Sequence, residues 1–92
     1  MKILIVEDNP DMRRMLADFV EHKFEQIYEC ADGSEAFGLY QKHLPDWVLM
    51  DWQMPRKDGI AATREIIKAY PLAKICLVTS FDDEFLRSEA LE

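Results

Sequence analysis

Four side chains that carry oxygen each stand at the end of an apolar run in this 92-residue chain: Glu7, Asp8, Asp51 and Thr79. Carboxylates that lie close together repel one another unless a cation lies between them. Mg²⁺ prefers oxygen ligands and commonly takes one or two protein carboxylates together with phosphate oxygens. A carboxylate beside this ion can also attack phosphorus, and a nearby hydroxyl can donate to a phosphoryl oxygen. If the four side chains meet in the folded protein, they predict a site for Mg²⁺ and a phosphoryl group.

Three apolar runs, at residues 2–6, 47–51 and 74–79, are the predicted strands that carry these side chains. Runs that are apolar throughout are typical of a parallel sheet that helices cover on both faces. A more polar stretch at residues 26–30 predicts a strand at the edge of the sheet. Because parallel strands end at the same edge, where ligands usually bind, we expect the four side chains to lie close together.

Helices are predicted between these strands. Asn9 is a good N-cap and Pro10 suits the first helical position, Ser34 is the predicted cap of the next helix, and a third helix covers residues 60–70. A fourth helix is predicted to begin at residue 84. The residues predicted to face the sheet are Met12, Leu16, Phe19 and Val20, then Ala36, Phe37, Tyr40 and Leu44, then Ile60, Ile66, Ile67 and Tyr70. Four alternations of strand and helix predict an α/β fold with a doubly wound parallel sheet.

Composition narrows the class of protein. The formal net charge of -7 disfavours nucleic-acid binding, which needs clustered basic residues. No apolar run is long enough to span a membrane, and no leader precedes the first strand, so we expect a cytoplasmic protein. Cys30 and Cys76 fit no metal-binding or redox spacing, and we expect two reduced, buried thiols. At this length the chain is expected to form one domain.

Three motifs together resemble the receiver domains of bacterial two-component response regulators: ILIVEDN at residues 3–9, LMDWQMP at residues 49–55 followed by Asp58-Gly59, and LVTS at residues 77–80. The resemblance implies a flavodoxin-like fold and a role in signal transduction. The segments 58–63 and 79–83 further resemble receivers that are joined to helix-turn-helix output domains.

By this resemblance, Asp51 is the phosphoacceptor. Mg²⁺ is then held by Asp8, Asp51 and the backbone carbonyl of Gln53, with Glu7 acting through water. Thr79 is the hydroxyl that contacts the phosphoryl group and switches the surface. The implied partner is a histidine kinase or phosphotransfer protein, and the chain itself is not an enzyme beyond slow self-phosphorylation from small donors and self-dephosphorylation.

The first helix offers a possible surface for the kinase. Arg13 and Arg14 lie on the side of this helix that is predicted to face water. An ordinary solvated helix face explains the same pattern, and the sequence leaves both interpretations open.

The resemblance ends before the family pattern is complete, because the fifth strand, its terminal lysine and the fifth helix have no counterpart in this sequence. We therefore expect residues 1–92 to form one truncated receiver of four strand–helix units, ending at the start of the fourth helix. The strand at residues 75–78 would be an apolar edge beside a half-bare sheet face, which favours self-association. We expect signalling to be impaired because the lysine and the last strand of the family pattern are missing.

Two alternatives remain open. The first is a self-associating structural fragment of a receiver that has no signalling activity. The second is a phosphatase of the haloacid dehalogenase type, which is disfavoured: such enzymes carry an Asp-x-Asp pair after the first strand, whereas Asp51 follows the third predicted strand and residue 53 is Gln.

Overall fold

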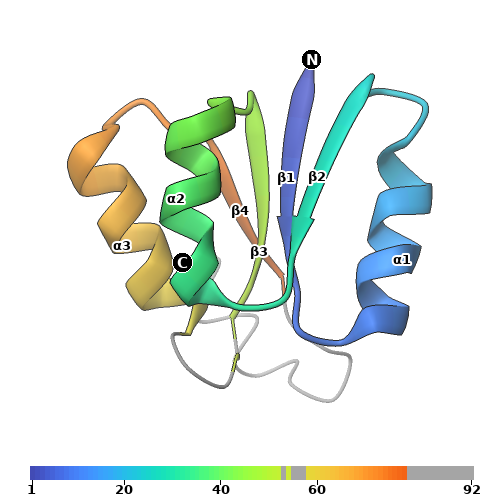
Figure 1. Cartoon of the computed structure of the whole chain (residues 1–92), viewed down its shortest axis with the longest axis horizontal. Helices are drawn as coiled ribbons and strands as arrows, with labels where there is room; N and C mark the ends of the chain where they lie inside the picture. Colours follow the sequence, from blue (N-terminus) through green and yellow to red (C-terminus); the bar gives the residue numbers. More distant parts are fainter. Residues whose placement is uncertain (53, 55–57, 79–92) are drawn as a thin grey trace.

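The computed structural model describes residues 1–52, 54 and 58–78. This part of the chain forms a parallel four-stranded sheet and three helices (Figure 1). In chain order the elements are β1 (Lys2–Val6), α1 (Pro10–Val20), β2 (Gln26–Cys30), α2 (Gly33–His43), β3 (Trp47–Asp51), α3 (Gly59–Ala69) and β4 (Ile75–Val78). The predicted fourth helix, Gln53 and Thr79 lie outside the described residues. No helix in the described ranges has the length and apolar character needed to cross a bilayer.

The strands follow the order β2-β1-β3-β4, and every neighbouring pair is parallel. This order confirms the predicted doubly wound α/β sheet, and it places β2 at an edge as predicted. The chain leaves β1 in one direction to reach β2 and crosses to the other side to reach β3. The order therefore reverses between β1 and β3, and crevices at such switch points are where α/β sheets bind ligands.

Helices cover the two faces of the sheet unequally, with α1 on one face and α2 and α3 on the other (Figure 1). The larger core joins alternate residues of β1 and β3 to α2 and α3, and its members include Leu4, Val6, Val48, Met50, Ala36, Tyr40, Ala62 and Ile66. The smaller core lies under α1 and comprises Ile3, Ile5 and Val20, with half-buried neighbours that include Leu16, Ala17 and Leu49. Both faces of β1 are therefore buried, as its apolar sequence predicted.

Short polar side chains cap the N-termini of the helices and determine where each helix begins. The Asn9 side chain accepts hydrogen bonds from the backbone N–H groups of Asp11 and Met12, which confirms the predicted cap of α1. Asp58 caps α3 in the same way. Ser34 was the wrong cap for α2: the Asp32 carboxylate accepts from the Ser34 N–H at 2.6 Å, so the helix begins earlier, at Gly33.

Two residues predicted to face the core are exposed instead. Phe19 is 82% exposed, because α1 turns Leu16, Ala17 and Val20 towards the sheet and Phe19 lies roughly a quarter turn away from Val20. Leu44 is 58% exposed, because it ends α2 in a left-handed conformation with φ of 47° that points the chain away from the helix.

The prediction of two buried thiols holds only for Cys30, because Cys76 is exposed. Cys76 pairs in register with Leu49 and thus lies on the face of the sheet that carries α1. Since α1 packs near β1 and leaves Leu49 itself only half-buried, its cover does not extend to the middle of β4.

Candidate functional site

Three carboxylates meet where β1 and β3 end. Glu7 and Asp8 follow the last residue of β1, and Asp51 is the last residue of β3. Val6 pairs in register with Met50, so the two strands bring these acids to the same level of the sheet. One oxygen from each carboxylate lies within 4.8 Å of the others. The structure thus brings together the acidic residues that the sequence predicted to meet.

The acids differ in their access to solvent. Glu7 and Asp51 are buried, with exposed fractions of 5% and 7%, whereas Asp8 is exposed. Burial penalises the ionised form and is the main reason why the pKa of Asp51 rises from 3.8 to about 8; hydrogen bonds and repulsion involving Asp8 and Glu7 add to the increase. Burial also raises the pKa of Glu7. The cluster thus holds less negative charge at neutral pH than three free carboxylates would.

The donor set suits a hard divalent cation. It consists of carboxylate oxygens alone, and one of its three members faces solvent, which leaves room for water in a coordination sphere. Mg²⁺ is typically bound by few protein carboxylates and keeps several waters. A bound cation would also offset the burial and repulsion that raise the pKa of Asp51. The residues present therefore fit Mg²⁺.

Hydrogen bonds fix the backbone of Glu7 at the end of β1. Its N–H donates to the Cys30 carbonyl at 3.1 Å, and its own carbonyl accepts from Arg13 Nη1 at 2.8 Å. Its carboxylate accepts from the Asn9 N–H at 3.1 Å. Arg13 was predicted to face water, but it is half-buried and reaches back to β1. The sequence contained no sign of this contact beyond the position of Arg13 in the second turn of the helix.

Gly59 packs directly on the backbone beneath Asp51. Its N–H donates to the Trp52 carbonyl at 2.7 Å, and a Cβ at this position would lie 2.1 Å from the Asp51 carbonyl oxygen. No side chain fits there. The sequence contained the Asp58-Gly59 pair, yet only the structure relates this glycine to Asp51.

The other predicted site residues divide into two groups. Gln53 and Thr79 lie outside the described residues, so their roles stay predictions. Arg14 is exposed on α1, as expected for a surface residue.

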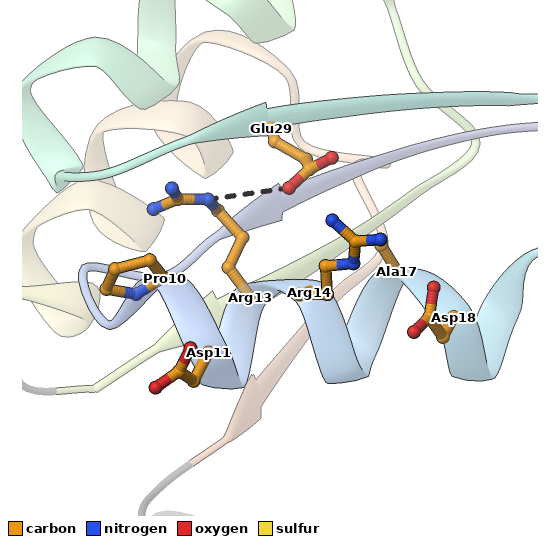
Figure 2. Close-up of a pocket in the computed structure, with 7 residues that line it drawn as sticks. All are labelled: Pro10, Asp11, Arg13, Arg14, Ala17, Asp18 and Glu29. Carbon is orange, nitrogen blue, oxygen red and sulfur yellow. Dashed lines mark ion pairs between the residues drawn. The ribbon is translucent and has the colours of Figure 1, made fainter.

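An open hollow lies between α1 and β2 (Figure 2). The residues that line it are Pro10, Asp11, Arg13, Arg14, Ala17, Asp18 and Glu29.

Sequence comparisons agree on one family. The family model of the response regulator receiver domain matches residues 3–92. The chain is 37% identical to the chemotaxis protein CheY of Halobacterium salinarum over 91 residues, which cover 99% of the chain and 76% of that protein. It is 36% identical to the transcriptional regulatory protein DegU of Brevibacillus brevis over 88 residues, which cover 91% of the chain but only 36% of DegU. The chain thus spans little more than a third of that longer relative.

Solved structures give the same result. The structure of the CheX–CheY–BeF₃–Mg²⁺ complex from Borrelia burgdorferi matches with a TM-score of 0.81 at 29% identity. The match covers 99% of this chain and 70% of that one. The flavodoxin-like fold of receiver domains is therefore the fold of this chain.

Proposed function

The chain belongs to the receiver domains of two-component response regulators, and from this membership we propose that it accepts a phosphoryl group on Asp51 in the presence of Mg²⁺. The observation that carries the proposal is the cluster of Glu7, Asp8 and Asp51, whose oxygens lie within 4.8 Å of one another at the switch point of the sheet. Asp51 lies on a rigid strand that pairs on both sides, with β1 and with β4. A nucleophile on such an element is held in one orientation.

The proposed reaction is a phosphoryl transfer to a carboxylate. One oxygen of ionised Asp51 attacks the phosphorus of a phosphohistidine on a kinase or phosphotransfer protein, or of a small donor such as acetyl phosphate. An O–P bond forms, and the P–N or P–O bond of the donor breaks. The electron pair leaves with the imidazole or the acetate, and Asp51 becomes an acyl phosphate. The chain otherwise acts as an acceptor, with at most slow self-dephosphorylation.

Asp8 and Asp51 are the proposed ligands of Mg²⁺, together with the backbone carbonyl of Gln53. Glu7 is proposed to act through water, which is consistent with its burial and its raised pKa. When bound, Mg²⁺ neutralises charge on the carboxylates and on the incoming phosphoryl group. A relative in this family, the CheY of Borrelia burgdorferi, has been solved in a complex with Mg²⁺ and BeF₃, which supports this assignment.

Partners and output follow from the family. We propose that a histidine kinase or phosphotransfer protein is the donor and approaches along α1, where Arg13 and Arg14 line the hollow. Thr79 would follow the phosphoryl group and pass the change to an output domain. The longer relative DegU is a transcriptional regulatory protein. We propose that this chain likewise passes its signal to an output that regulates transcription.

The test is phosphorylation by a small donor. The purified chain is incubated with acetyl phosphate and MgCl₂ and then analysed by intact-mass spectrometry. We expect one phosphate adduct that is lost in EDTA and in Asp51→Asn. Asp18→Asn, at an exposed carboxylate on α1, is the matched control and should keep the adduct. An adduct that persists in Asp51→Asn, or no adduct on the wild-type chain, would refute the proposal.

A second copy of this chain is a further proposed partner. Among the described strands β4 is an edge, its Cys76 is exposed, and Ile75, Leu77 and Val78 are only half-buried. An apolar edge strand favours pairing with another chain. This observation supports self-association through the β4 edge and the adjoining sheet face.

A further inference from the structure

Arg13 connects three elements around the turn that carries Glu7 and Asp8, and Figure 2 shows its ion pair with Glu29. It lies on α1, and its Nη1 donates to the Glu7 carbonyl at the end of β1 at 2.8 Å. Its Nε lies 3.4 Å from Glu29 Oε1 on β2. The Arg13 side chain is 23% exposed and the Glu29 side chain 42% exposed, so the ion pair is shielded from solvent on the Arg13 side. One guanidinium therefore links α1, β1 and β2.

The bonded carbonyl belongs to the peptide that joins Glu7 to Asp8. A peptide group is planar, so a hydrogen bond to the Glu7 oxygen also fixes the nitrogen of Asp8. On its other side, Glu7 is held by the bond from its N–H to Cys30. With both flanks fixed, the direction in which Asp8 leaves β1 towards Asp51 is set by these two contacts.

Arginine is suited to this position by its shape. Its planar guanidinium carries five N–H donors in a fixed fork, so separate nitrogens can serve the Glu7 carbonyl and the Glu29 carboxylate at once. A lysine keeps the positive charge but offers a single nitrogen on a flexible stem. An Arg13→Lys variant therefore keeps the positive charge and removes the guanidinium geometry, so the two effects can be measured separately.

We propose that Arg13 is a positioning residue of the metal site, holding the Glu7–Asp8 turn so that Asp8 and Asp51 face one cation. The inference rests on the proposed function, because it assumes that the acidic cluster binds Mg²⁺. Charge and position have opposite consequences here. A positive charge beside the cluster repels the cation, so removing the charge alone would strengthen Mg²⁺ binding. Losing the hydrogen bond that fixes the turn would instead weaken Mg²⁺ binding.

The experiment is calorimetric titration of the full chain with MgCl₂. We expect the Kd to increase about tenfold in both Arg13→Gln and Arg13→Lys, the effect typical of residues that orient metal ligands. Arg64→Gln, at an exposed arginine on α3, is the matched control and should leave the Kd unchanged. Thermal unfolding in EDTA establishes that each variant is folded.

Glu29→Gln keeps the proposal testable if the Arg13 variants fail to fold. It removes one contact of the guanidinium and should therefore weaken Mg²⁺ binding, as the Arg13 variants do. Glu21→Gln, at the exposed C-cap of α1, controls for the loss of one negative charge.

Three results would overturn the proposal: a tighter Kd in Arg13→Gln, full affinity in Arg13→Lys, or an unchanged Kd accompanied only by a lower unfolding temperature. A wild-type chain that binds no Mg²⁺ would overturn the proposed metal site as well. Wild-type binding with unaffected variants overturns this inference alone.

Discussion

Ionising Asp51 is costly in the folded, metal-free protein, because its carboxylate is buried beside two other acids. Burial and two neighbouring acids raise its pKa to about 8, compared with 3.8 for an ordinary aspartate. Between these two values the folded protein binds a proton that the unfolded chain releases. The contribution of Asp51 to the free energy of unfolding of the metal-free protein therefore decreases as pH rises from about 4 to about 8.

This cost predicts that Asp51→Asn stabilises the metal-free protein. In EDTA at pH 8, we expect the free energy of unfolding of the variant to be higher than that of the wild-type protein by on the order of a few kcal/mol. This difference should become smaller towards pH 5. Urea denaturation at several pH values measures it. The prediction would be contradicted if the free energies of unfolding of the two proteins changed with pH in the same way. Excess MgCl₂ should restore stability to the wild-type protein more than to the variant.

At the scale of elements, the start of α3 is fixed against the end of β3 by a contact that admits no side chain. A Cβ on Gly59 would lie 2.1 Å from the Asp51 carbonyl oxygen and 2.9 Å from the Trp52 Cα. Both neighbours are backbone atoms, so either β3 or the first turn of α3 must shift to admit a methyl group. A shift of β3 would move Asp51, the residue proposed as the phosphoacceptor, and a shift of α3 would break the bond from the Gly59 N–H to the Trp52 carbonyl that follows it.

We therefore expect Gly59→Ala to lower the free energy of unfolding by about 2 kcal/mol and to weaken Mg²⁺ binding. Gly38→Ala is a control with the opposite sign. Gly38 lies within α2, and apart from the neighbouring backbone of that helix no atom lies within 4 Å of an added Cβ, so alanine should stabilise the helix by about 0.5–1 kcal/mol. Thermal and urea unfolding, together with MgCl₂ titration, measure both effects. Equal effects at the two glycines would show that the contact with Asp51 is unimportant.

At the scale of the whole molecule, the three helices of the described residues do not cover the four described strands over their full extent. On the face that carries α1, Leu49 is half-buried and Cys76 is exposed, and β4 is an edge among the described strands. Exposed apolar strand residues of this kind commonly mark an interface or a site of aggregation.

The proposed self-association predicts an oligomer at micromolar concentration. Sedimentation velocity under reducing conditions should show a species larger than the monomer, and Cys76→Lys should shift it towards the monomer because a charge on an edge strand opposes pairing. Leu72→Lys adds the same charge at a residue that is 93% exposed between α3 and β4, and it should have no effect. A compact monomer at all concentrations would refute the prediction.

The order and limits of the elements could be predicted from the sequence because their signals are local. Asn9 and Pro10 mark the start of α1, and apolar runs that end in an acid mark β1 and β3. General rules for parallel sheets place the carboxyl ends of the strands at one edge, which predicted that Asp8 and Asp51 lie close together. The strand order β2-β1-β3-β4 is given by the structure. The sequence by itself therefore determined the fold class and the acidic cluster.

Other features were decided only by the tertiary structure, because they depend on how each helix lies over the sheet. The rotation of α1 turns Phe19 to solvent and brings Arg13 to the Glu7 carbonyl, and its place near β1 leaves Cys76 exposed. The approach of Gly59 to Asp51 likewise joins two elements across a loop. Helical periodicity identifies an apolar stripe, but packing against distant residues selects which side chains within one turn meet the sheet.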